Sequence, residues 1–126
     1  MVKVRGLRGA TTADTNTQES LLEATRELLI QMTEENQVDT QDIAAVFFTT
    51  TPDLDAEFPA LAARKIGWEH VPLLGASEIG VPGAVGLCIR VLILMNTEKN
   101  QRELSHIYLK GAKNLRSRGA EDQVSS

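Results

Sequence analysis

Apolar side chains gather most densely over residues 86–95, a stretch of strand length that reads GLCIRVLILM. Because side chains of a strand alternate between its two faces, one face is apolar throughout, and the other carries three apolar side chains around Arg90. A strand of this kind is expected to be buried on both faces. Arg90 keeps its charge at any workable pH, so it requires an anionic partner. That partner is either a carboxylate of the protein, with Glu78 a nearby candidate, or a bound ligand.

The segment before the first helix has the alternation of a second strand. Residues 2–7 alternate apolar and polar side chains and place Arg8 at the end of the valine-bearing face. Residues 9–12 are small and are expected to form a loop. The pattern therefore directs a second cation, Arg8, towards an interior edge.

Helical spacing follows this loop. Apolar side chains recur at intervals of three, four and seven, which predicts an amphipathic helix capped by Asp14 or Thr15 and ended at Asn36. After a short turn capped by Asp39 or Thr40, a buried strand is expected over residues 43–51.

The second half of the chain predicts shorter elements, punctuated by glycine and proline. These are a helix over residues 58–66, a strand over 68–74 at an edge or irregular position, a glycine-rich loop over 75–83, a last strand over 104–110 and a helical turn over 111–116. Strands and helices mix without strict alternation, which indicates an α+β fold with one mixed sheet and helices on one face. Two helices cannot cover both faces, so an oligomer that packs sheet against sheet is expected.

Length and charge narrow the class of protein. The 126 residues with 42% hydrophobic content fit a single domain, expected over residues 1–116, with a flexible polar tail over 117–126. A net charge of -4 argues against nucleic acid or an anionic membrane as the main partner.

No apolar stretch has the length of a membrane span, and the N-terminus lacks an apolar signal segment, so a cytoplasmic location is expected. The single cysteine, Cys88, is expected to be a core thiol.

The remaining side chains exclude most catalytic chemistry. Two histidines and one cysteine give no zinc spacing, and no calcium loop, dinucleotide fingerprint or nucleophile elbow is present, so neither a metal nor a cofactor is expected. Four arginines lie at predicted strand and loop ends, and their planar guanidinium groups can each donate two hydrogen bonds to a carboxylate, which suits binding of a small polyanion. They are Arg8, Arg64, Arg90 and Arg116.

Several ordered motifs resemble one known family. They are RGLRGATT at residues 5–12, TPDLDAEFPA at 51–60, Gly67-Trp68 with Val71-Pro72, and CIRV at 88–91. Together they resemble the AroH class of chorismate mutases, over roughly residues 2–116. The resemblance implies a cofactor-free rearrangement of chorismate to prephenate on the route to phenylalanine and tyrosine. It also implies a homotrimer with a barrel-like core of sheets and active sites at the subunit interfaces.

The resemblance implies roles for individual residues within one subunit. Arg90 would lie beside the ether oxygen on which negative charge grows, a catalytic role of the electrostatic kind. Glu78 would accept a hydrogen bond from the ring hydroxyl, and Arg8 and Tyr108 would bind substrate carboxylates. Arg116, after Leu115 in the C-terminal segment, would help to close the site.

Other implied contacts come from the neighbouring subunit or from backbone groups. Phe58 would form a wall and Arg64 a positive rim, and the backbone N–H groups of Leu74 and Gly75 could donate to the substrate. The chain departs from the family pattern at three positions, where relatives often have a lysine, a smaller polar residue and a cysteine. These positions are Leu61, Leu74 and Gly75. The departures affect peripheral contacts, and hence affinity more than reaction type.

Two competing functions remain open at the level of sequence. The first is an imine or enamine deaminase of the small trimeric RidA-like type, whose expected motifs are not evident. The second is a non-catalytic trimer that binds an anionic metabolite. Chorismate distinguishes them, because a deaminase would leave it unchanged and a binder would hold it without consuming it.

Overall fold

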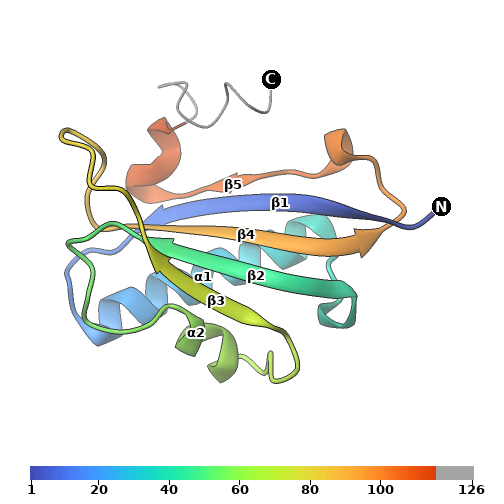
Figure 1. Ribbon diagram of the computed structural model, residues 1–126, viewed down its shortest axis with the longest axis horizontal. Coiled ribbons are helices and arrows are strands. Elements are labelled where there is room, and N and C mark those ends of the chain that lie inside the picture. Colours follow the sequence, from blue (N-terminus) through green and yellow to red (C-terminus); the bar gives the residue numbers. More distant parts are fainter. Residues whose placement is uncertain (116–126) are drawn as a thin grey trace.

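The computed structural model describes residues 1–115, and these form a five-stranded mixed sheet with two α-helices (Figure 1). The strands are β1 (Lys3–Thr12), β2 (Ile43–Thr50), β3 (Leu73–Ser77), β4 (Cys88–Thr97) and β5 (Ile107–Tyr108). The helices are α1 (Gln18–Asn36) and α2 (Ala60–Lys65), with short 3₁₀ turns η1 (Thr40–Asp42), η2 (Gln101–Glu103) and η3 (Lys110–Asn114). Arg116 and the expected tail over residues 117–126 lie outside the described residues.

The strand that carries Arg90 is the centre of the sheet, whose order is β3-β2-β4-β1-β5. β4 runs antiparallel to β1 and β2, whereas β3 and β5 pair in parallel with β2 and β1. The register places Arg90 between Ala10 and Thr49. The predicted α+β class with a mixed sheet is confirmed, and so is the predicted edge position of the third strand.

One face of the sheet packs against α1 and forms the main core. Leu7, Phe48 and Ile93 from three strands and Leu28 from the helix are at most 1% exposed. Burying a side chain of this size stabilises the fold by about 1.5–3 kcal/mol. A Cβ atom on Gly9 would overlap Sδ of Met32, so the absence of a side chain allows α1 to approach β1 closely.

The opposite face of the sheet is only partly covered. η3 covers one end, where Ala112 and Leu115 pack on Ala10 and Cys88. Further along the same face, apolar side chains are half-buried or exposed, namely Val4, Phe47, Leu74, Leu92 and Leu94. The expectation that the Arg90 strand is buried on both faces therefore holds for one face only within a single chain. Cys88 is the buried thiol that the sequence predicts.

Three predicted strand boundaries are wrong. Residues 9–12 are not a loop, because Gly9 to Thr12 continue β1 and pair with β4. The third strand begins at Leu73 and not at residue 68, because Trp68 and Val71 turn into the core as part of a connecting segment. The last strand is also shorter than predicted, with only Ile107 and Tyr108 paired to β1.

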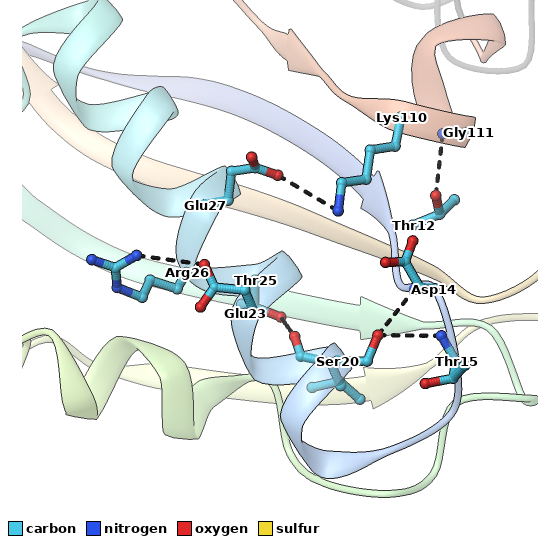
Figure 2. A network of polar contacts seen from close by, with 11 residues as sticks. Thr12, Asp14, Thr15, Ser20, Glu23, Thr25, Arg26, Glu27, Lys110 and Gly111 are labelled. Carbon is cyan, nitrogen blue, oxygen red and sulfur yellow. Dashed lines mark hydrogen bonds and ion pairs between the residues drawn. The ribbon is translucent and has the colours of Figure 1, made fainter.

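The predicted caps of the first helix are displaced. The N-cap is Thr17, whose side chain accepts from the Ser20 N–H. Ser20 Oγ accepts from the backbone N–H groups of Asp14 and Thr15 (Figure 2). The left-handed residue at the other end is Gln37, with a φ of 51°, and not Asn36. Asn36 is buried and bonds to Ser105. The predicted Asp39 cap of the following turn is confirmed.

The end of β1 also holds the C-terminal turn in place. Thr12 Oγ1 accepts from the Gly111 N–H at 3.1 Å, and Lys110 lies 3.9 Å from the Glu27 carboxylate (Figure 2). The ion pair is largely exposed and contributes little. The hydrogen bond to Thr12 and the packing of Ala112 and Leu115 fix the position of η3 over the end of the sheet.

Candidate active site

Arg90 meets the carboxylate that the sequence proposes for it. Its Nε lies 3.2 Å from Oε2 of Glu78, and the two side chains are 29% and 16% exposed. Thr49 Oγ1 donates to the same carboxylate oxygen at 2.6 Å. The backbone places Glu78 here, because its N–H donates to the Thr50 carbonyl at the end of β2, 2.8 Å away. The carboxylate and the guanidinium thus hold each other on the open face of the sheet.

A hollow of about 250 Å³ lies on this face between the two predicted cations. Arg8, Thr49 and Arg90 supply its polar lining, and Phe47 and Leu92 supply apolar side chains. Arg8 is positioned from two sides, because it pairs with Leu92 in the register and its backbone N–H donates to Nδ1 of His106 at 2.9 Å. Two guanidinium groups line the hollow, and the one carboxylate paired with Arg90 leaves the region net positive, which suits an anionic ligand.

Tyr108 and Leu115 lie at the η3 end of the same face. Tyr108 pairs with Ala10, which is itself the neighbour of Arg90, so the tyrosine lies two strands from the guanidinium. Leu115 is 3% exposed and packs in a small cluster with Cys88 and Ala112. The structure therefore brings Tyr108 towards the Arg90 end of the sheet and gives Leu115 a packing role. Arg116 follows directly but lies beyond the described part of the chain.

The other predicted site residues lie elsewhere in the chain. Phe58 is 76% exposed and lines a second hollow of about 440 Å³, together with Gly75 at the β3 edge. Arg64 Nη1 donates to the carbonyls of Trp68 at 2.6 Å and Glu69 at 2.9 Å, and so fixes the turn after α2. Neither Phe58 nor Arg64 lines the hollow at Arg90.

Leu74 shares the open face with Arg90, because it pairs with Phe47. Its side chain is 59% exposed at the edge of the sheet. Strand edges present backbone N–H and C=O groups that have no partner strand, so β3 can offer backbone donors to a molecule bound beside it.

Thr49 is a site residue that was not predicted from the sequence. Its hydroxyl lies opposite Arg90 in the register and is one of the two groups that hold the Glu78 carboxylate. The signal was the alternation of β2, which puts Phe47 and Thr49 on one face. It could not be used without knowing that β2 pairs with the Arg90 strand.

Within residues 1–115 the structure has no cluster of three or more side chains able to hold a metal ion. Among the same residues no helix is long and apolar enough to cross a membrane.

Comparisons with known proteins agree on one family. A family model described as chorismate mutase type I matches residues 4–118. A chorismate mutase AroH of Thermus thermophilus is 50% identical over 114 residues, which cover 90% of this chain and 93% of that protein. A chorismate mutase AroH of Bacillus subtilis (strain 168) is 40% identical over 107 residues, covering 84% of each chain.

A solved structure agrees as well. A chorismate mutase from Clostridium thermocellum superposes with a TM-score of 0.84 at 45% identity, covering 86% of this chain and 96% of that chain. The matched family, the two relatives and the shared fold all support the resemblance found in the motifs. The chain belongs to the chorismate mutase type I family.

Proposed function

We propose that the hollow beside Arg90 is one half of the active site in which this protein rearranges chorismate to prephenate. As a member of its family the protein is a chorismate mutase, an isomerase. The observation that supports the site is the fixed guanidinium of Arg90, held 3.2 Å from Glu78 on the open sheet face beside Arg8. The reaction serves the synthesis of phenylalanine and tyrosine.

The chemistry accounts for the absence of a nucleophile among the site residues. In this Claisen rearrangement a C–O bond breaks and a C–C bond forms in one pericyclic step, so the protein needs to restrain the substrate and stabilise charge. Partial negative charge grows on the ether oxygen as the C–O bond opens. A preorganised cation beside that oxygen stabilises the transition state more than the ground state. Arg90 is the group that supplies this cation.

The neighbouring side chains orient the substrate. Arg8, across the hollow, binds one substrate carboxylate, and Tyr108 donates to a carboxylate near it. Glu78 accepts from the ring hydroxyl while it fixes Arg90. Thr49 holds Glu78 in turn. The two guanidinium groups and the Tyr108 hydroxyl thus face the negatively charged parts of the substrate, and the Glu78 carboxylate faces its hydroxyl group.

The site is completed by a second subunit of a homotrimer. The open face carries apolar side chains that a single chain leaves in contact with water, with Val4 at 55% and Leu74 at 59% exposed. Packing the sheets of three subunits into a barrel-like core would bury this face. It would also allow Phe58, Arg64, Leu74 and Gly75 of one subunit to meet the Arg8 and Arg90 half-site of the next.

Two further parts of the proposal concern the C-terminal segment and the location. Arg116, next to Leu115, helps to close the site when substrate enters, and Leu115 contributes by holding this segment on the sheet. A cytoplasmic location accords with the single cysteine of the sequence, since small exported domains more often carry paired cysteines.

The activity is tested by mixing the purified protein with chorismate and following the loss of its ultraviolet absorbance. The expected result is catalytic loss of chorismate with prephenate as the product. Unchanged chorismate that does not bind would favour a deaminase of the RidA-like type. Chorismate that binds without being consumed would indicate a non-catalytic binding protein. Either of these two results would overturn the proposed function.

A further inference from the structure

Side chains continue the pairing of β2 and β4 beyond the point where the β2 backbone stops. The last backbone bond runs from the Thr51 N–H to the Cys88 carbonyl at 3.0 Å, and the Cys88 N–H donates to Thr51 Oγ1 at 2.9 Å. The next residue is Pro52, which has no N–H to donate. The start of β4 therefore has to be held by another group.

The carboxylate of Asp53 is that group. Its two oxygens accept from the Leu87 N–H at 3.0 and 2.9 Å, and Thr51 Oγ1 donates to it at 2.5 Å. The hydrogen bond from Thr51 is the main reason that the pKa of Asp53 lies below its ordinary value; partial burial opposes this shift, and the Leu87 N–H adds to it. A Cβ on Gly86 would lie 2.7 Å from the carboxylate, so the close approach depends on glycine there.

Leu87 needs to be held because of its backbone conformation. Its φ is 50°, in the left-handed region that branched side chains rarely adopt. The Leu87 N–H donates to Asp53, and the Leu87 carbonyl accepts from the Ala13 N–H at 2.8 Å. Three segments, the ends of β1 and β2 and the start of β4, thus meet at this one residue.

This junction lies next to both members of the Arg90 pair. The connection between β3 and β4 begins at Glu78, whose N–H is bound by the Thr50 carbonyl, and ends at Leu87, whose N–H is bound by Asp53. Both ends of the connection are therefore fixed to the end of β2. Leu87 lies three residues before Arg90, so a shift of Leu87 would displace the guanidinium from Glu78.

We propose that Asp53 is a positioning residue for the active site, which acts through Leu87 to fix the start of β4 and so the relative placement of Arg90 and Glu78. This role rests on the proposed function. Asp53 does not need to touch the substrate. Its effect is on the geometry that favours the transition state, and small displacements of such groups are costly for rate.

The test compares Asp53→Ala and Asp53→Asn with wild type well below the thermal midpoint of each protein. In Asp53→Ala, kcat is expected to fall by about 10- to 100-fold while KM changes by less than about threefold. In Asp53→Asn, one side-chain oxygen still accepts from Leu87, so kcat should recover part of this loss. The affinity of each variant for a stable bicyclic diacid shaped like the transition state should fall in parallel with its kcat.

Two control variants separate this role from general stability and charge. Asp42→Ala removes an exposed carboxylate at the opposite end of β2, and Leu22→Ala removes a half-buried side chain of α1. Both are expected to keep wild-type kcat, even where Leu22→Ala lowers the midpoint as much as Asp53→Ala does. Equal kcat values for Asp53→Ala, Asp53→Asn and wild type would overturn the positioning role while leaving the proposed function intact. A wild-type protein without turnover would overturn both.

Discussion

At the scale of single residues, the site depends on Arg90 being held by groups of the same chain. Glu78 lies 3.2 Å from the guanidinium, and Thr49 donates to Glu78 at 2.6 Å. The pair was predictable from sequence, because a cation in an apolar strand requires an anion and Glu78 is close along the chain. The role of Thr49 was not predictable, because it depends on which strand pairs with β4.

Glu78→Gln tests the pair directly. Glutamine keeps the shape of the side chain and one acceptor oxygen but loses the charge that holds Arg90 and that, in the proposed site, accepts a hydrogen bond from the ring hydroxyl of the substrate. Losing a charged acceptor costs about 2 kcal/mol, which is about thirtyfold in kcat/KM. Steady-state kinetics on chorismate check this, with Thr49→Ser as the variant that keeps the supporting hydroxyl. Full activity in Glu78→Gln would show that the carboxylate charge is unnecessary.

The lowered pKa of Asp53 predicts that the stability of the fold depends on pH. This pKa is lower in the folded state because of the hydrogen bonds from Thr51 and Leu87. The ionised form is therefore stabilised by folding, so the contribution is present at neutral pH and is lost as the pH falls through the folded pKa. The difference in free energy of unfolding between wild type and Asp53→Asn should shrink as the pH is lowered from 7. Urea unfolding at several pH values measures it, and a constant difference would contradict the linkage.

At the scale of elements, the hydrophobic pattern identified the main pieces but misplaced their ends. The faces of the Arg90 strand, the long helix and the edge position of the third strand follow from periodicity and proline. The extension of β1 over Gly9 to Thr12 was missed, because small residues carry a loop signal that pairing with β4 overrides. Asp14 and Thr15 are good capping residues, yet Ser20 binds their backbone groups and leaves the cap to Thr17.

The helix start can be tested by substitution. Thr17→Ala removes the side-chain oxygen that accepts from the Ser20 N–H, and loss of such a cap costs about 1 kcal/mol of unfolding free energy. Thr15→Ala, at the position that sequence alone predicts, should cost less than about half of that. Thermal or urea unfolding of the two variants gives the comparison. A larger loss in Thr15→Ala would place the cap where the sequence pattern put it.

At the scale of the whole molecule, the proposed site extends beyond a single chain. The structure brings Arg8, Thr49, Glu78 and Arg90 together, but Phe58 and Arg64 lie away from them. In the proposed trimer, Phe58 and Arg64 would meet the site across a subunit interface, and periodicity cannot predict how subunits meet. The apolar open face of the sheet is the surface that would bring them together.

Assembly is therefore expected to be required for activity. Three chains of 13.8 kDa give about 41 kDa, which light scattering or analytical ultracentrifugation can measure. Leu94→Glu would put a charge on the half-buried open face and should reduce both the mass and kcat. Gln31→Glu, on the exposed side of α1, should change neither. A fully active monomer would contradict the interfacial site.

We expect catalysis to depend above all on Arg90, the fixed cation that stabilises the negative charge developing on the ether oxygen. The measurement that checks this role is kcat/KM for chorismate in Arg90→Ala, with Arg26→Ala on the exposed face of α1 as the matched control. Removing a preorganised donor costs about 3 kcal/mol, so the account predicts a loss of at least about 100-fold with the fold intact, and no loss in the control. Turnover by Arg90→Ala at the wild-type rate would contradict the account.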